Sequence, residues 1–199
     1  MEMSEECTLV GLEIHPLTPD RWQDLETLFG RRGACAGCWC MYWRLNRAKF
    51  SDMAGEGNRR AFQQIVDSGE VPGLVAYTEG KPVGWISVEP RQVFPVLSRS
   101  RILKPVDEQP VWSIVCFFVA RPYRRKGLTV HLLGEAVRYA AEHGAKIVEG
   151  YPVDTQTGQY PDTFAYIGTA SAFRQAGFKE ILRRSEKRPI MRYFIEPQS

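Results

Sequence analysis

A basic turn with one glycine separates the longest apolar run of the sequence from an amphipathic segment. The turn, RRKGLT, consists of Arg124, Arg125, Lys126, Gly127, Leu128 and Thr129; VWSIVCFFVA precedes it, and apolar residues at helical spacing follow it. A strand, a turn and a helix in this order expose backbone N–H groups at the positive end of the helix dipole, which suits a phosphate or diphosphate. The turn lacks the spacing of a nucleoside triphosphatase loop and of a dinucleotide fingerprint. It therefore predicts an anion site of another kind or, alternatively, an ordinary solvated loop.

Three cysteines stand close together in the segment GACAGCWCMYWRL. Cys35, Cys38 and Cys40 could supply thiolates to zinc, but a closed tetrahedral site needs a fourth ligand and the sequence offers none nearby. We therefore predict no metal site. A zinc-responsive or redox protein remains a weaker alternative.

Composition excludes several classes of protein. Of the 199 residues, 44% are hydrophobic and 25% charged, and 26 Lys and Arg against 23 Asp and Glu give a net charge of +3. That charge is too small to argue for nucleic acid, and no apolar run approaches the roughly 20 residues that span a bilayer. The N-terminal MEMSEECTLV is acidic, unlike a secretory signal. We expect a cytoplasmic protein, without membrane or nucleic-acid partners, in which the cysteines remain thiols.

The hydrophobic periodicity indicates an alternation of strands and helices. Strands are expected over 8–17, 73–78, 83–89, 111–120, 145–153, 178–185 and 189–196, and helices over 19–29, 62–66, 128–143 and 164–176. The order is therefore β α α β β β α β α β β. It predicts a single α/β domain over residues 1–199, with its core at 8–196 and a mixed, mostly antiparallel sheet flanked by helices. The crossover helix after the central strand requires at least one parallel pair of strands.

The turn and a second motif together resemble the GNAT acyltransferase superfamily. RRKGLT is similar to the R-x-x-G-x-[GA] diphosphate turn of that family, and FRQAGFKEI contains the Gly-Phe pair, Gly177 and Phe178, that follows its last helix. The resemblance implies the GNAT fold and transfer of an acyl group, usually acetyl, from acyl-coenzyme A to an amine. By the same resemblance, the turn residues bind the diphosphate, and Phe118 and Val119 line the pantetheine arm. Thr129 departs from the pattern, which usually has Gly or Ala there.

A second departure concerns the proton-transfer groups that the resemblance implies. Many members carry a tyrosine near the thiol end of the coenzyme, where this chain has Phe173, which cannot donate a proton. Tyr166 lies seven residues earlier, on the same face of the expected helix, and could protonate the leaving thiolate; alternatively it packs at the edge of the core. Glu149 could act as the base, directly or through water, or could be a solvent-facing carboxylate. For Cys116, a buried inert thiol is favoured over a covalent acyl-enzyme.

Two further segments have candidate roles in binding the acceptor. In GNAT folds the region between the first two helices often flanks the acceptor site, so Trp39, Tyr42 and Trp43 could form an aromatic wall there, or could pack the helices onto the sheet. The basic stretch before the central strand could bind an acidic acceptor or the 3′-phosphate of the coenzyme, or could be solvated. It contains Arg91, Arg99, Arg101 and Lys104.

The sequence therefore predicts an N-acetyltransferase that uses acetyl-coenzyme A and acts on a primary amine of a small molecule or peptide, as a monomer or homodimer. The alternative is a module that binds acyl-coenzyme A as a sensor and has lost turnover, which the phenylalanine at position 173 favours.

Overall fold

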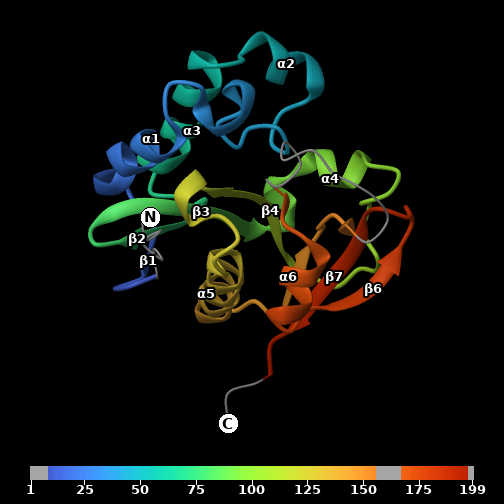
Figure 1. The fold of residues 1–199 in the computed structure, drawn as a ribbon. Coiled ribbons are helices and arrows are strands. Elements are labelled where there is room, and N and C mark those ends of the chain that lie inside the picture. Colours follow the sequence, from blue (N-terminus) through green and yellow to red (C-terminus); the bar gives the residue numbers. More distant parts are fainter. Residues whose placement is uncertain (1–8, 156–166, 197–199) are drawn as a thin grey trace.

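The computed structural model describes residues 9–155 and 167–196, in which seven strands form one sheet (Figure 1). The strand order is β1-β2-β3-β4-β5-β7-β6. The strands are β1 (Glu13–Pro16), β2 (Gly73–Thr78), β3 (Lys81–Pro90), β4 (Trp112–Val119), β5 (Ile147–Gly150), β6 (Lys179–Arg183) and β7 (Pro189–Phe194). All neighbouring pairs are antiparallel except β4 and β5, which are parallel. The predicted α/β class, mixed sheet and parallel pair are confirmed.

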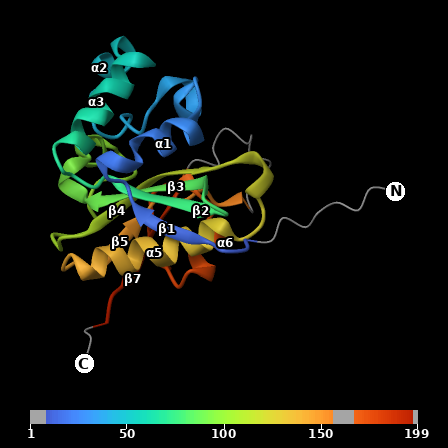
Figure 2. The ribbon, with the colours of Figure 1, turned by 90° about the vertical axis from the view of Figure 1, so that its left-hand side faces the viewer.

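Helices cover both faces of this sheet. They are α1 (Trp22–Phe29), α2 (Arg47–Asp52), α3 (Glu56–Asp67), α4 (Pro95–Arg99), α5 (Leu128–Glu142) and α6 (Ala170–Gln175). Figure 2 shows α1, α2 and α3 on one side of the sheet and α5 on the other. No helix in the described ranges is long and apolar enough to cross a membrane.

Two hydrophobic clusters fill the spaces between the sheet and its helices. The first contains Trp22, Phe62 and Trp85 and lies on the side of α1 and α3. The second contains Leu132 of α5, Phe173 of α6 and Phe117 of β4. The helices α3 and α5 form because their apolar residues recur at helical spacing and are buried on one face.

The central strand β4 is irregular where it meets its neighbours. Ser87 of β3 is opposite Cys116, but Val88 is opposite Ile114, so Val115 is an extra residue in β4. Such a bulge shifts the alternation of side chains. Accordingly, the consecutive side chains of Val115 and Cys116 both pack into the first cluster.

Several expected element boundaries were wrong, and two helices were not predicted. The helix expected over 62–66 is longer and spans Glu56–Asp67. In the part of 8–17 that the structure describes, strand forms only from Glu13 to Pro16. Two helices, α2 and α4, arise in polar segments that had not been predicted as helical. The helix expected over 164–176 begins only at Ala170, because Gly168 has a φ of 73° and Thr169 is the extended N-cap, whose side chain accepts a hydrogen bond from the Ala172 N–H.

Candidate functional site

The predicted diphosphate turn forms the connection between β4 and α5. Gly127 is the N-cap of α5, with φ 81° and ψ −4°, a left-handed conformation that glycine adopts at little cost. Arg125 also has a positive φ, of 61°. Among the hydrogen bonds of the described residues, none uses the backbone N–H groups from Arg125 to Thr129. The turn therefore presents a row of available donors at the positive end of a 15-residue helix.

The side chains of the turn divide into charged and anchoring groups. Arg124, Arg125 and Lys126 are exposed, and the Arg124 Nε donates to the Val119 carbonyl at 3.0 Å. Leu128 is 1% exposed and packs in the second cluster, so it anchors the helix start and can offer a ligand only its backbone. Thr129 is half-buried. This combination of free N–H groups, exposed cations and an unobstructed glycine fits a diphosphate.

Near this turn, β4 continues beyond the last residue that pairs with β5. The β4–β5 ladder contains only three pairs and ends at Ile114 opposite Gly150, although β4 continues to Val119. From Val115 onward, the edge of β4 that is turned away from β3 pairs with no described strand. Peptide groups along such an edge can hydrogen bond to an extended ligand, as an added strand would. Phe118 packs toward the first cluster and Val119 toward the second.

Phe173 lies where the pairing of β4 and β5 ends, and its side chain is completely buried. Its ring contacts Phe117 and Phe178 at centroid distances of 6.0 and 4.9 Å. A Cβ added to Gly150 would lie 2.2 Å from the ring, so the glycine at the end of β5 makes room for it. The phenylalanine therefore fills the space between the ends of the β4–β5 ladder and α6.

Glu149 is also buried, with 1% of its surface exposed, and does not face solvent. Its Oε1 accepts hydrogen bonds from Arg91 Nη1 at 2.9 Å and from the Tyr151 hydroxyl at 2.7 Å. Its Oε2 accepts one from Arg192 Nε at 2.7 Å. Two guanidinium groups thus neutralise this carboxylate, which opposes its action as a free base.

The network around Glu149 extends in both directions. The Tyr151 hydroxyl contacts Arg91 and lies 2.9 Å from the Ser113 hydroxyl, and burial raises the pKa of Tyr151 well above its usual value. On the other side, Arg192 donates to both oxygens of Asp107, at 2.6 and 3.0 Å. The network connects β4, β5 and β7 to the segment between β3 and β4.

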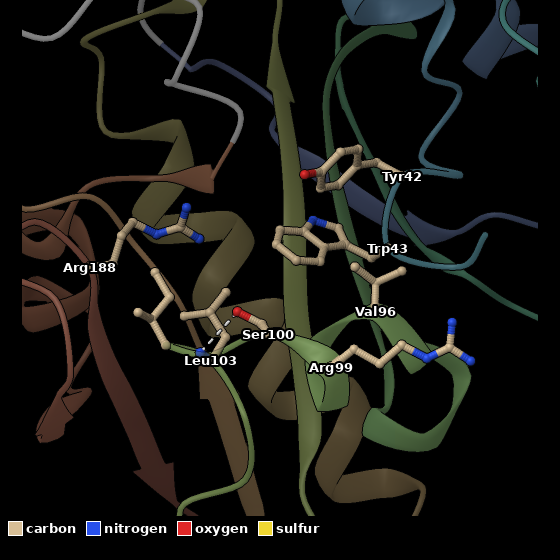
Figure 3. Close-up of a pocket in the computed structure, with 8 residues that line it drawn as sticks. Tyr42, Trp43, Val96, Arg99, Ser100, Leu103 and Arg188 are labelled. Carbon is tan, nitrogen blue, oxygen red and sulfur yellow. Dashed lines mark hydrogen bonds between the residues drawn. The ribbon is translucent and has the colours of Figure 1, made fainter. Parts of the chain in front are cut away.

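The three aromatic residues that were expected near the acceptor have different environments. Trp39 is 4% exposed and packs against Trp22 and Phe29, so it belongs to the core. Tyr42 is 45% exposed, and Trp43 is 7% exposed. Tyr42 and Trp43 line a pocket of about 370 Å³, together with Val96, Arg99, Ser100, Ile102, Leu103 and Arg188 (Figure 3).

The cysteines become more buried along the loop toward β4. Cys35 is exposed, Cys38 is half-buried, and Cys40 and Cys116 are buried with their Sγ atoms 3.5 Å apart. Burial raises the pKa of Cys38 to about 12, and the contact with Cys40 together with burial raises that of Cys116. Within residues 9–155 and 167–196, no three His, Cys, Asp or Glu side chains are grouped to hold a metal ion.

Tyr166 lies outside the described residues. The argument for it assumed one continuous helix from 164 to 176, and α6 instead begins at Ala170, so the helical spacing between Tyr166 and Phe173 does not apply. Its role stays a prediction.

Sequence reasoning missed the partners of Glu149. The period-2 alternation of a strand places Glu149 and Tyr151 on the same face, so that contact could have been predicted. Arg91 and Arg192 are 58 and 43 residues away from Glu149, and no local pattern connects them. Three aromatic residues were likewise given one candidate role, but only the folded chain separates Trp39 in the core from Tyr42 and Trp43 at the pocket.

Comparisons with known proteins agree with this geometry. Among the similar solved structures is PaiA N-acetyltransferase from Thermoplasma acidophilum in complex with coenzyme A, with 15% sequence identity and a TM-score of 0.53 over 94% of this chain and 100% of that chain. A GNAT family acetyltransferase from Streptococcus agalactiae has 13% identity and a TM-score of 0.55 over 94% of this chain and 97% of its own. Ribosomal-protein-alanine N-acetyltransferase from Brucella melitensis has 15% identity and a TM-score of 0.51 over 92% of this chain and 99% of its own. At these identities they show a common fold. No curated protein sequence matches.

The family comparison goes further than the fold. The model of the acetyltransferase (GNAT) family matches residues 39–158, which is more than half of the chain and includes the turn, β4 and β5. The chain therefore belongs to the GNAT family of acetyltransferases.

Proposed function

We propose that this acetyltransferase transfers the acetyl group of acetyl-coenzyme A directly to a primary amine of a small molecule or peptide. Membership of the GNAT family supports acetyl transfer from acyl-coenzyme A in general. The observation that carries the proposal is the β4–α5 turn, with its unused N–H groups and a left-handed Gly127 beside the open edge of β4.

The turn and the strand edge support a set of coenzyme-binding residues. Backbone N–H groups from Arg125 to Thr129 would hold the diphosphate, and the exposed Arg124, Arg125 and Lys126 would add positive charge. The edge of β4 around Phe118 and Val119 would receive the pantetheine amides, which directs the thioester toward the end of the β4–β5 ladder. In this arrangement Phe173 borders the thiol end by filling the space behind it.

The names of two structural neighbours support an amine acceptor. One neighbour is an N-acetyltransferase in complex with coenzyme A, and another is a ribosomal-protein-alanine N-acetyltransferase. From these neighbours we extend to this chain the type of reaction, which is acetylation of a nitrogen atom. We do not extend the substrates of the neighbours to this chain.

The reaction needs a neutral amine and a stabilised leaving thiolate. Tyr166 remains our proposal for the acid, and Tyr166→Phe is expected to lower turnover without changing coenzyme affinity. For Glu149, the bonds to Arg91, Tyr151 and Arg192 favour a positioning role over that of a base. It would hold the end of β5 against the segment before β4.

A catalytically lapsed sensor is the second candidate. It is favoured by Phe173, which has no proton to donate and whose ring is fully buried. The two functions share coenzyme binding and differ in turnover.

One experiment tests coenzyme binding and turnover in turn. Calorimetry with acetyl-coenzyme A is expected to give saturable binding, which Gly127→Val weakens. Release of free thiol is then followed with a panel of amines. Acceptor-dependent release supports the transferase, binding without release from any acceptor supports the sensor, and absence of binding contradicts both.

A further inference from the structure

The pocket beside Trp43 is built from three segments that are distant in the sequence. Tyr42 and Trp43 follow α1, Val96 to Leu103 form and follow α4, and Arg188 lies in the turn between β6 and β7. Figure 3 shows Tyr42, Trp43 and Val96 on one side and Arg188 on the other. The volume of about 370 Å³ is within the range of roughly 300–1,000 Å³ of small-molecule sites.

Hydrogen bonds hold these walls together. The Val96 N–H donates to the Trp43 carbonyl at 3.3 Å. Arg184, from the β6–β7 turn, donates to the carbonyls of Lys104 and Pro105 at 2.5 and 2.9 Å. Because side chains and backbone of all three segments are tied in this way, the pocket is formed before a ligand binds.

Along the length of β4, the pocket lies near the residues at which pairing with β5 ends. Arg44, next to Trp43, forms a buried ion pair with Glu89, which is opposite Ser113 of β4. Arg91 donates through Nη2 to the Leu103 carbonyl at 2.6 Å and through Nη1 to Glu149, which pairs with Ser113. Ser113 precedes Ile114, the last residue of β4 that pairs with β5, so these contacts link the pocket walls to the part of β4 that a thioester on its edge would reach.

The lining combines apolar surface with positive charge. Tyr42, Trp43, Val96, Ile102 and Leu103 supply apolar surface, and Arg99 and Arg188 supply two cations. The described lining contains no carboxylate. In the described chain, Arg99 is exposed and forms no ion pair, and the indole N–H of the buried Trp43 donates to no protein acceptor. An arginine fork suits a carboxylate, which it can bind through two parallel hydrogen bonds.

We propose that the acceptor is an amine that also carries a carboxylate, namely an amino acid with an apolar or aromatic side chain. Its carboxylate binds Arg99, its side chain packs on Tyr42 and Trp43, and its amine points to the end of the β4–β5 ladder. This inference rests on the proposed function and names its substrate class. It disfavours polyamines, because the described lining offers the Arg99 guanidinium and no carboxylate that could bind an ammonium group.

Binding of reaction products tests the inference without relying on turnover. N-acetylphenylalanine and its uncharged counterpart N-acetylphenethylamine are titrated into the protein saturated with coenzyme A. A charge-assisted hydrogen bond predicts at least about tenfold tighter binding of the carboxylate. Equal binding of the two, or no binding of N-acetylphenylalanine, overturns the inference.

Two matched variants assign the effect to the pocket. Arg99→Gln is expected to reduce affinity for N-acetylphenylalanine about tenfold and to leave N-acetylphenethylamine unchanged. Arg47→Gln removes an exposed cation of α2 outside the lining and is expected to change neither. Equal losses in the two variants overturn the assignment to Arg99. If the saturating titration shows that coenzyme A itself does not bind, the proposed function fails first, so the two failures are distinguishable.

Discussion

Gly127 is the residue on which the proposed coenzyme binding depends most directly. Its φ of 81° disfavours any side chain, and a Cβ there would meet no protein atom within 4 Å, so it would project into open space at the turn where we propose the diphosphate. We expect Gly127→Ala to weaken acetyl-coenzyme A binding about tenfold, through backbone strain of about 1–2 kcal/mol and crowding of the anion. Calorimetry measures the change.

Gly134 provides the matched control for this substitution. It lies in α5 with no protein atom within 4 Å of an added Cβ and has an ordinary helical conformation. Gly134→Ala should leave affinity unchanged, and an equal loss in both variants would argue against the turn as the diphosphate site.

Glu149 is expected to matter for stability more than for proton transfer. Glu149→Gln removes the charge that compensates the buried guanidinium of Arg192 and that of Arg91, and breaking such a pair costs about 3 kcal/mol. Denaturant unfolding should show this loss, while the pH–rate profile keeps its shape. Disappearance of the acidic limb of that profile would instead identify Glu149 as the base.

The cysteines should react in the order of their exposure. Cys35 is exposed, whereas burial raises the pKa of Cys38 to about 12 and contact with Cys40 raises that of Cys116. Since the thiolate is the reactive form, among the four cysteines of the described residues iodoacetamide should modify Cys35 first, Cys38 slowly, and Cys40 and Cys116 only after unfolding. Peptide mapping by mass spectrometry gives the order. Early alkylation of Cys116 in the folded protein would contradict its burial.

At the scale of elements, the segment between β3 and β4 is held by the ion pair of Asp107 with Arg192. Hydrogen bonds from Arg192 lower the pKa of Asp107 from 3.8 to about 2. A lowered folded-state pKa means that this contribution to stability is complete above about pH 4 and is lost as the pH falls toward 2. Wild-type protein should therefore lose thermal stability over this interval more steeply than Asp107→Asn.

The adjacent carboxylate is a suitable control for this pH dependence. Glu108 forms no ion pair in the described part of the chain, so Glu108→Gln should keep the wild-type slope between pH 4 and 2. A slope for Asp107→Asn identical to that of wild type would show that the ion pair does not stabilise the segment.

Elements with strong periodicity could be predicted from sequence, and elements fixed by single residues could not. β4 and α5 were found because long apolar patterns continue through them. α6 was placed too early because apolar residues such as Phe164, Ile167 and Phe173 recur at helical spacing. Only the backbone conformation of Gly168 and Thr169 shows that the helix starts after them. α2 depends on an N-cap, in which the Asn46 side chain accepts from the Lys49 N–H, within a polar stretch that has little apolar pattern.

At the scale of the whole molecule, the sheet brings the parts of the site together. The proposed diphosphate turn was recognisable in the sequence because its residues are contiguous. The pocket was only partly predictable, because Trp43, Arg99 and Arg188 meet through the order of strands and through Arg184, whose hydrogen bonds span about 80 residues of chain. Such long-range contacts leave no local pattern.

The stretch of β4 that is unpaired on its β5 side connects the two ends of the proposed site. One end is the turn at the start of α5, and the other is the pocket at the level of Ser113. The open edge of β4 runs between them. The central claim is that acetyl-coenzyme A lies along this edge with its diphosphate at Gly127.

Calorimetric titration of the purified protein with acetyl-coenzyme A, compared with the same titration of Gly127→Val, tests this claim most directly. The account predicts saturable binding to the wild-type chain and a loss of at least about tenfold in the folded variant. Absence of binding to the wild-type chain, or equal affinity of the two proteins, would contradict it.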